Sequence, residues 1–190
     1  MEFYIENFTV GEELQKDTIK NHINEKFKTL PVKKILLVNP PDVDNNIFDF
    51  SIAKRGRSNN YPAYGLGVLA KNLQLNNFDV TICNLNHEVL KAVAEHTNEQ
   101  AFDYDEAWQH ALDQTIDEFN PDLVAVTCVF TVTHPSFTKV CQYTKNPGTS
   151  GNTHRNLPLA IGGVHVTHDI ATVLQEIPEA DYAFLNESEL

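Results

Sequence analysis

The sequence is poor in cysteine, in basic residues and in long apolar runs, and each shortage argues against a class of protein. Its three cysteines, Cys83, Cys128 and Cys141, are odd in number and far apart, which argues against a disulfide framework and favours a reducing, cytoplasmic location. Apolar runs such as residues 35–38 are far too short to cross a membrane, and the acidic N-terminal stretch MEFYIENFTVGEEL lacks the apolar core of a secretory signal. Lys and Arg total 14 against 26 Asp and Glu, and the net charge of −12 argues against a general nucleic-acid or anionic-membrane binder.

What the sequence does contain is an alternation of strand-like and helix-like segments. Apolar runs predict five strands, within residues 33–41, 79–85, 123–130, 157–163 and 181–185. Apolar residues at helical spacing predict four helices between them, within residues 64–78, 104–122, 135–146 and 167–177. The second helix turns its Trp108 face toward the core, and the fourth turns Ile170, Val173, Leu174 and Ile177 inward. This pattern predicts an α/β fold: a flavodoxin-like (Rossmann-like), doubly wound, five-stranded parallel sheet in the order 2-1-3-4-5.

Three segments lie outside this alternation. Residues 1–31 carry an apolar helical face and predict an N-terminal helical extension before a main domain of residues 32–190. Residues 86–103 lengthen the connection after the second strand, and a short helix is expected inside it. Residues 146–156 are polar and turn-rich, and we expect a surface loop without chemistry because ligands bind at the opposite, carboxyl edge of such sheets.

The carboxyl ends of the strands therefore hold the candidate site. Asn39, Pro40 and Pro41 follow the first strand, and their prolines lack the amide donors of a flavodoxin phosphate loop. Toward the end of the third strand the chain has Thr127-Cys128-Val129 where a phospho-acceptor would need an aspartate, and no G-x-G-x-x-G follows the first strand. Gly162 and Gly163 end the fourth strand. Such a pair either gives a ligand room beside the backbone or packs a helix against a strand, and the residues alone leave both readings open.

Five motifs in this order resemble the cobalamin-binding domain that precedes the catalytic core of cobalamin-dependent radical S-adenosylmethionine (radical SAM) enzymes. They are Asn39-Pro40-Pro41, YPAYGLGVLAKNL, PDLVAVTCVF, IGGVHVT and ADYAFLNESE, and the resemblance covers about residues 33–190. It implies that the nucleotide tail of cobalamin lies between strands beside the glycine pair, with the corrin ring across their carboxyl ends. The cofactor-binding residues implied in this way are Asn39, Pro40, Pro41, Tyr61, Pro62, Gly65, Leu66, Thr127, Val129, Thr131, Gly162, Gly163, His165, Thr167 and Glu187.

The sequence also departs from related families. Cobalamin mutases and methionine synthase carry D-x-H-x-x-G after the first strand, and no histidine here has an aspartate two residues before it. The resemblance therefore implies base-off cobalamin without a histidine ligand to cobalt. The family commonly ends this region in G-E-G-E, where this chain has Asn186-Glu187-Ser188-Glu189, so both glutamates remain and both glycines are absent.

The catalytic part of such an enzyme is not in this chain. The three cysteines cannot form C-x-x-x-C-x-x-C, so a 4Fe-4S cluster and S-adenosylmethionine would belong to a radical SAM domain in cis after Leu190. We expect a non-catalytic cobalamin-binding module, either a fragment of a longer enzyme or free-standing. The alternatives are a cobalamin carrier or sensor without activity, and a flavodoxin-like domain for another small ligand or partner.

Four other features have simpler readings. His165 and His168 are spaced i, i+3, but with no third ligand in the motif we expect His165 to be a hydrogen-bonding loop residue and predict no metal ligands. We expect Cys128 to behave as a small, buried, apolar residue. The basic cluster at residues 54–57 reads as a solvated loop, and Asp42 with Asp44 lacks any adjacent nucleophile.

Overall fold

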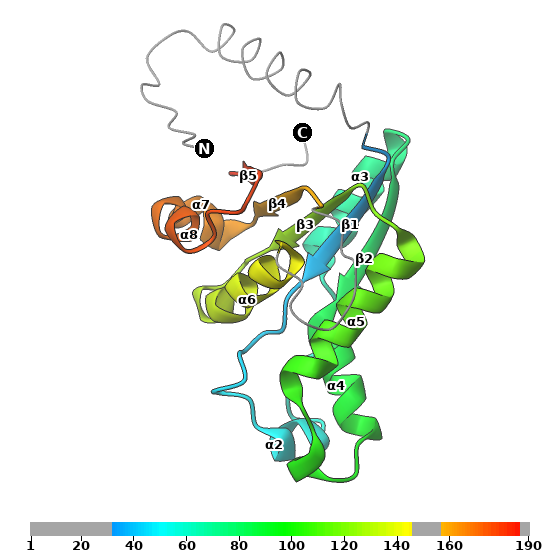
Figure 1. The fold of residues 1–190 in the computed structure, drawn as a ribbon, viewed down its shortest axis with the longest axis vertical. Coiled ribbons are helices and arrows are strands. Elements are labelled where there is room, and N and C mark those ends of the chain that lie inside the picture. Colours follow the sequence, from blue (N-terminus) through cyan, green and yellow to red (C-terminus); the bar gives the residue numbers. More distant parts are fainter. Residues whose placement is uncertain (1–31, 146–156, 187–190) are drawn as a thin grey trace, which may run out of the picture. The chain divides into compact units, whose positions relative to one another are not determined.

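A computed structural model describes residues 32–145 and 157–186, and its centre is a sheet of five parallel strands (Figure 1). The strands run in the spatial order β2-β1-β3-β4-β5. Their bounds are β1 (Lys34–Asn39), β2 (Asp79–Asn84), β3 (Leu123–Thr127), β4 (Leu159–Gly162) and β5 (Tyr182–Phe184). The predicted fold class and strand order are therefore confirmed.

The pairing register brings the carboxyl ends of the strands to one edge. β1 pairs with β2 and with β3, so Asn39 lies opposite Asn84 at the end of the first pair. Thr127, the last residue of β3, lies opposite Gly162, the last residue of β4. Because β2 and β3 lie on opposite sides of β1, the chain reverses its winding direction here and leaves the crevice in which such sheets bind ligands.

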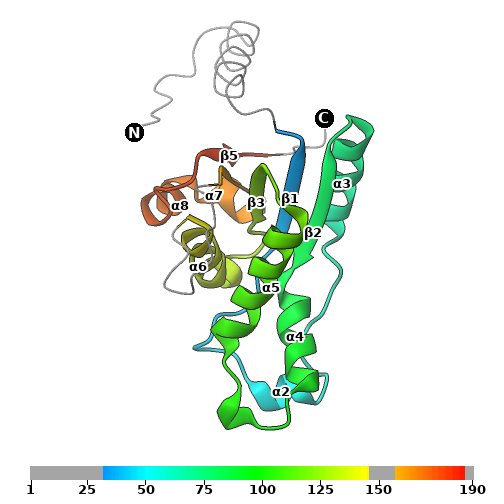
Figure 2. The same cartoon turned by 45° about the vertical axis from the view of Figure 1, so that its right-hand side comes forward.

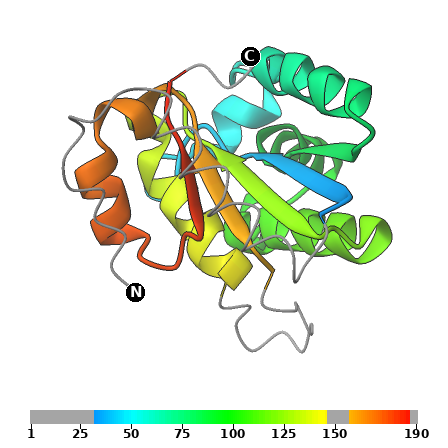
Figure 3. The ribbon, with the colours of Figure 1, turned by 90° about the horizontal axis from the view of Figure 1, so that it is seen from above.

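Helices cover both faces of the sheet. α3 (Tyr64–Leu75) packs on one face, and α5 (Tyr104–Phe119), α6 (His134–Lys145) and α8 (Ile170–Glu176) pack on the other (Figure 3). The shorter elements are α2 (Phe50–Lys54), α4 (Leu85–Glu95), α7 (Val164–His168) and two 3-10 turns, η1 (Glu99–Ala101) and η2 (Thr131–Thr133). None of the helices in the described ranges has the length and apolarity needed to cross a membrane.

The largest apolar core lies between the sheet and the second helical layer. Alternate residues of β1, Leu36 and Val38, point into it and are fully buried. Trp108 of α5 and Phe137 of α6 meet them there, with Trp108 only 3% exposed. The predicted core face of the second long helix is thus confirmed.

Helix ends follow the polar residues that the sequence provides. The Asp103 side chain accepts a hydrogen bond from the backbone N–H of Glu106 and caps the start of α5. Asn120 ends the same helix in a left-handed conformation, φ 49°, which asparagine tolerates better than most residues.

The predicted helix over residues 167–177 is wrong in its bounds. The chain instead forms α7 immediately after Gly163, breaks at Asp169, and continues as α8. Val173 and Ile177 are fully buried as expected, but Leu174 is 40% exposed. Because the helix is broken at Asp169, a single helical spacing carried across both segments does not predict which residues face the core.

The segment at residues 86–103 is mostly helical. α4 begins directly after β2 and packs against α2 and α5 (Figure 2). The helix expected over HEVLKAVAEH, residues 87–96, is confirmed, but it begins earlier, at Leu85, because the Asn84 side chain caps it by accepting from the N–H of His87. The predicted N-terminal helical extension, the loop at residues 146–156 and the predicted site residue Glu187 lie outside the described residues.

Candidate functional site

A cavity of about 1050 Å³ lies at the carboxyl edge of the sheet, at the switch point between β1 and β3. Its volume is just above the roughly 300–1000 Å³ usual for small-molecule sites. Its walls come from the ends of β1 and β3, from the segments that follow β3, β4 and β5, from the start of α3 with the loop before it, and from α7. The lining residues are Asn39, Asp42, Tyr61, Pro62, Ala63, Tyr64, Gly65, Leu66, Leu69, Thr127, Val129, Phe130, Gly163, Val164, Thr167, His168 and Asn186.

Most of the predicted site residues meet in this cavity although they come from distant parts of the sequence. Nine of the fifteen line it: Asn39, Tyr61, Pro62, Gly65, Leu66, Thr127, Val129, Gly163 and Thr167. Five others do not: Pro40, Pro41, Thr131, Gly162 and His165. Pro40 and Pro41 are buried, and the Pro41 carbonyl accepts a hydrogen bond from the Ser136 hydroxyl, which ties this turn to α6.

Eight lining residues were missed by sequence reasoning. They are Asp42, Ala63, Tyr64, Leu69, Phe130, Val164, His168 and Asn186. Leu69 could have been found, because it lies one helical turn after Leu66 and so shares its face. Asp42 and Phe130 directly neighbour predicted residues. The contribution of His168 depends on where α7 begins and ends, which the sequence pattern predicted wrongly.

The loop between β1 and α3 is fixed in place by hydrogen bonds. The Asn86 side chain accepts from the N–H of Asp42 at 3.1 Å and donates to the carbonyl of Asn59 at 3.0 Å. The Tyr104 hydroxyl donates to the Val43 carbonyl, and burial raises the pKa of Tyr104 well above its usual range, so the hydroxyl stays protonated. The loop therefore presents a preformed wall to the cavity.

The cavity is lined largely by apolar and aromatic groups. Tyr61, Tyr64 and Phe130 are 74%, 82% and 65% exposed, which is unusual for large aromatic side chains. Asp42 is the only acidic residue among the lining residues, and desolvation raises the pKa of its carboxyl. These walls fit a large ligand with a broad apolar face and few charges.

The glycine pair does not leave an open slot at Gly163. This residue has φ 107°, and a Cβ placed on it would lie 2.5 Å from the carbonyl oxygen of Cys128. The close approach lets the N–H of His165 donate to that same oxygen at 3.1 Å and starts α7 against β3. A side chain at Gly163 would therefore disturb the packing of α7 against β3. A Cβ on Gly162 would meet the Phe184 carbonyl oxygen at 3.3 Å.

His165 forms hydrogen bonds, as predicted, but it does so from α7 and not from a loop. It is 7% exposed, and its Nε2 lies 2.8 Å from Nδ1 of His134. Burial, followed by the nearby His134, lowers the pKa of His165 and favours the neutral imidazole. Cys128 is fully buried, as predicted, but its thiol lies 3.4 Å from the Thr133 hydroxyl and so has a polar neighbour.

After β5 the chain adopts a left-handed backbone conformation, which glycine usually adopts, at an asparagine. Asn186 has φ 61°, and its N–H donates to the Thr167 hydroxyl at 2.9 Å. Asparagine is one of the few residues that adopt this conformation readily, so the chain end meets α7 at the cavity despite the absence of a glycine.

The basic cluster at residues 54–57 has a structural role at Lys54. Its ammonium group donates to the carbonyls of Val93 and Ala94, at 3.1 and 2.8 Å, and also to that of His96. These carbonyls lie at the C-terminal end of α4, where a cation is favourable. Lys54 therefore holds α2 against α4 and does not line the cavity.

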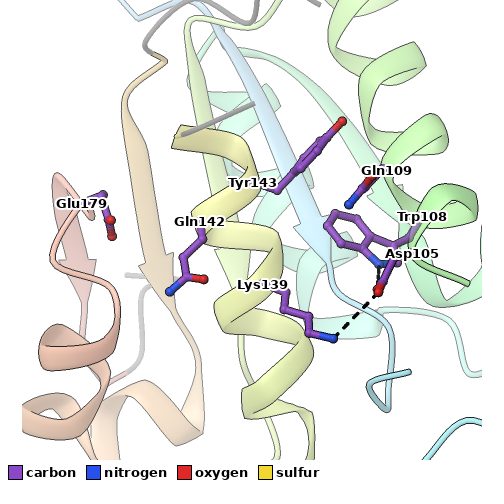
Figure 4. Close-up of a pocket in the computed structure, with 7 residues that line it drawn as sticks. All are labelled: Asp105, Trp108, Gln109, Lys139, Gln142, Tyr143 and Glu179. Atoms are coloured by element: carbon purple, nitrogen blue, oxygen red, sulfur yellow. Dashed lines mark hydrogen bonds and ion pairs between the residues drawn. The ribbon is translucent and has the colours of Figure 1, made fainter. Parts of the chain in front are cut away.

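A smaller cavity of about 430 Å³ lies over α5 and α6 (Figure 4). It is lined by Asp105, Trp108, Gln109, Lys139, Gln142, Tyr143 and Glu179, none of which was a predicted site residue. The Trp108 indole N–H donates to the Asp105 carboxylate at 2.9 Å, and Lys139 lies 3.9 Å from the same side chain. This hollow is not at the strand ends, so it is a poorer candidate for the main ligand site.

The sheet order and the cavity at its switch point define a flavodoxin-like ligand-binding domain. Comparison with protein families identifies which one: residues 53–190 match the B12 binding domain, and the chain belongs to that family. This membership supports the cobalamin binding that the sequence motifs indicate.

Comparisons with solved structures and curated proteins add less information about this chain than the family match does. A crystal structure of a novel cobalamin-binding protein from Desulfitobacterium hafniense DCB-2 is similar at a TM-score of 0.41 and 17% identity. The alignment covers 90% of this chain and 61% of the other, so this chain spans less than two thirds of that protein's length. No curated protein matches the sequence.

Proposed function

We propose that this chain is the cobalamin-binding module of a radical SAM enzyme and that it holds cobalamin base-off, without a histidine ligand to cobalt. The observation that supports this most is the cavity at the switch point, which nine of the predicted site residues line from four separate stretches of sequence. Cobalamin would supply a cobalt centre that carries a methyl group or electrons for chemistry on an unknown substrate, and the protein's part is to bind and orient it.

The residues present suit this role. Leu66, Leu69 and Val129 offer an apolar surface, and the exposed rings of Tyr61 and Tyr64 stand at the same cavity. Thr127 and Thr167 offer hydroxyl groups at the strand ends, where polar edges of the ligand can accept or donate hydrogen bonds. Together these groups would exclude water from one side of a large planar ligand.

The loop after β1 supports the absence of a histidine ligand. Residues 40–63 contain no histidine, and the loop contributes Asp42, Tyr61, Pro62 and Ala63 to the cavity. The lining histidine, His168, belongs to α7 after β4. The other histidine of α7, His165, forms a hydrogen bond with His134 and does not line the cavity.

The catalytic step would require a further domain. Cys83, Cys128 and Cys141 are all buried and free, and their spacing does not match the three-cysteine motif of a radical SAM cluster. A C-x-x-x-C-x-x-C motif in the sequence after Leu190 would support the radical SAM assignment. Its absence there would favour a cobalamin carrier or sensor.

The binding proposal is tested by mixing the purified chain with hydroxocobalamin and passing it through a desalting column. We expect the chain to retain cobalamin with a base-off absorbance spectrum. A base-on spectrum, or no retention, would count against the proposal.

Two helical glycines provide a matched pair of variants for the same assay. Gly65 lines the cavity and Gly67 does not, and neither has an atom within 4 Å of the position a Cβ would occupy. Gly65→Leu should fill the cavity mouth and abolish retention, whereas Gly67→Leu should retain cobalamin. Both variants should melt at or above the wild-type temperature, because leucine favours a helix over glycine by about 1 kcal/mol. Equal retention by the two variants would argue against this cavity as the binding site.

A further inference from the structure

A cluster of three potential metal ligands lies beside the cobalamin cavity and outside its lining. The Sγ atom of Cys128 and one ring nitrogen each of His134 and His165 lie within 4.8 Å of one another. Cys128 follows β3, His134 begins α6 and His165 lies in α7, so the cluster joins three elements at the carboxyl edge (Figure 1). None of the three residues lines the cobalamin cavity.

The cluster lies in a dry part of the protein. Cys128 is fully buried, His165 is 7% exposed, and the His134 side chain is 14% exposed. Three polar groups in such a place need partners, because burying them without any costs free energy. The histidines are partnered by each other and by neighbouring side chains, and the thiol lies 3.4 Å from the Thr133 hydroxyl.

The outer nitrogens of the two histidines are held by oxygen atoms. Nε2 of His134 lies 2.9 Å from the Glu176 carboxylate, and Nδ1 of His165 lies 3.4 Å from the Thr131 hydroxyl. This leaves Nδ1 of His134 and Nε2 of His165 facing each other at 2.8 Å. A metal-binding histidine commonly donates its other ring N–H to a carboxylate or similar oxygen, and both rings here have that orientation.

We propose that Cys128, His134 and His165 form a zinc site that braces the wall of the cofactor cavity. One thiolate and two neutral imidazoles are a ligand set that Zn²⁺ favours, with a fourth position left for water. Zinc would replace the hydrogen bond between the rings. Bonds of about 2.0–2.1 Å at a tetrahedral angle require the two nitrogens to be about 3.3 Å apart, so the rings must separate by about 0.5 Å.

Protons and charge balance in this step. The S–H bond of Cys128 breaks, a zinc–sulfur bond forms, and one proton leaves to solvent. The proton between the two rings moves to Nδ1 of His165, where it can be donated to Thr131, and His134 keeps its proton toward Glu176. The bound ion would fix the start of α6 and α7 relative to β3, and these elements flank the lining residues Phe130 and Val164.

The test uses the full chain, freed of metal with a chelator and without cobalamin, so it is independent of the proposed cofactor. After addition of Zn²⁺ and desalting, elemental analysis should find one zinc per chain, with a higher melting temperature than the metal-free protein. Co²⁺ in place of zinc should give a thiolate-to-cobalt charge-transfer band. Cys128→Ser should lose that band and most of the zinc, and His110→Gln and Cys83→Ser serve as controls that should keep both.

Glu176→Gln tests the site without changing a ligand, so its result does not depend on whether a ligand variant folds. This variant should fold, because the Glu176 side chain is 49% exposed and the change is small. This variant should bind zinc about 10–100-fold more weakly than wild type, as expected for loss of an outer-shell carboxylate. The proposal is overturned if the wild-type chain retains no zinc, if the cobalt form shows no thiolate band, or if Glu176→Gln binds zinc as tightly as wild type.

Discussion

Replacing Gly163 with alanine should destabilise the fold strongly, because two separate costs fall on one residue. Its backbone, at φ 107° and ψ 171°, lies in a region that is essentially restricted to glycine, and a side chain there costs about 1–3 kcal/mol. The added Cβ would also lie 2.5 Å from the carbonyl oxygen and 2.9 Å from the carbonyl carbon of Cys128. These are backbone atoms that cannot rotate away, so local overpacking adds about 1–3 kcal/mol.

The sum is about 4 kcal/mol, a large part of the roughly 5–15 kcal/mol by which a domain of this kind is stable. For a chain of this length, each kcal/mol lowers the melting temperature by about 2–4 °C, so we expect a fall of about 8–16 °C. Urea unfolding followed by far-UV circular dichroism gives the free energy directly, and a thermal scan gives the melting temperature.

Two other glycines calibrate this measurement. Gly162→Ala should cost about 1 kcal/mol, since its Cβ would lie 3.3 Å from the Phe184 carbonyl oxygen and a small shift relieves the contact. Gly67→Ala should stabilise by about 0.5–1 kcal/mol, because its Cβ meets no atom within 4 Å and alanine favours a helix. If Gly163→Ala proved as stable as Gly67→Ala, the close packing of Gly163 against Cys128 would be refuted.

Three further substitutions or treatments test other parts of the structure. Trp108→Ala should lower the free energy of unfolding by about 3–5 kcal/mol in urea titrations, while cobalamin retention in the cold persists because Trp108 does not line the cavity. Asn186→Val should cost about 1–2 kcal/mol by the same method and Asn186→Gly only a few tenths, because position 186 has φ 61°. Cys141 should resist iodoacetamide at about pH 8 in the folded protein and react in denaturant, because burial raises the pKa of its thiol well above the usual range.

Each of these three predictions would be contradicted by a specific result. Loss of cobalamin retention by a Trp108→Ala chain that is still folded would mean that the core and the cavity are coupled in a way the structure does not explain. Equal stability of the Val and Gly variants at position 186 would contradict its left-handed backbone. Rapid native-state alkylation of Cys141, located by peptide mapping, would contradict its burial.

Sequence periodicity predicted the sheet because a parallel strand is buried on both faces. The continuous apolar runs that became β1 and β3 have no other stable environment in a soluble domain, and the helices between them fix the parallel direction. The position of the ligand cavity followed from strand order alone, since the winding direction reverses between β1 and β3. Nine of the fifteen predicted site residues line this cavity.

Contacts between distant segments could not be predicted in this way. No local pattern shows that the position of a Gly163 side chain is filled by the Cys128 carbonyl, because the two residues are brought together only by the pairing of β3 with β4. For the same reason no motif indicated which side chains lie beside His165: Cys128 and His134 reach it through the fold, from the end of a different strand and from a different helix.

The sequence by itself determined the order of the strands and most of the secondary structure, because these depend on local periodicity and on general rules of chain winding, but it misplaced the bounds of α7 and α8. Only the tertiary structure decided which side chains line the cavity and which support it from behind. His165 and His168 illustrate the difference: they are three residues apart in α7, yet His168 lines the cavity and His165 bonds to His134. The direction of a short helix is set by the packing of its neighbours, and no repeat within its own five residues can specify it.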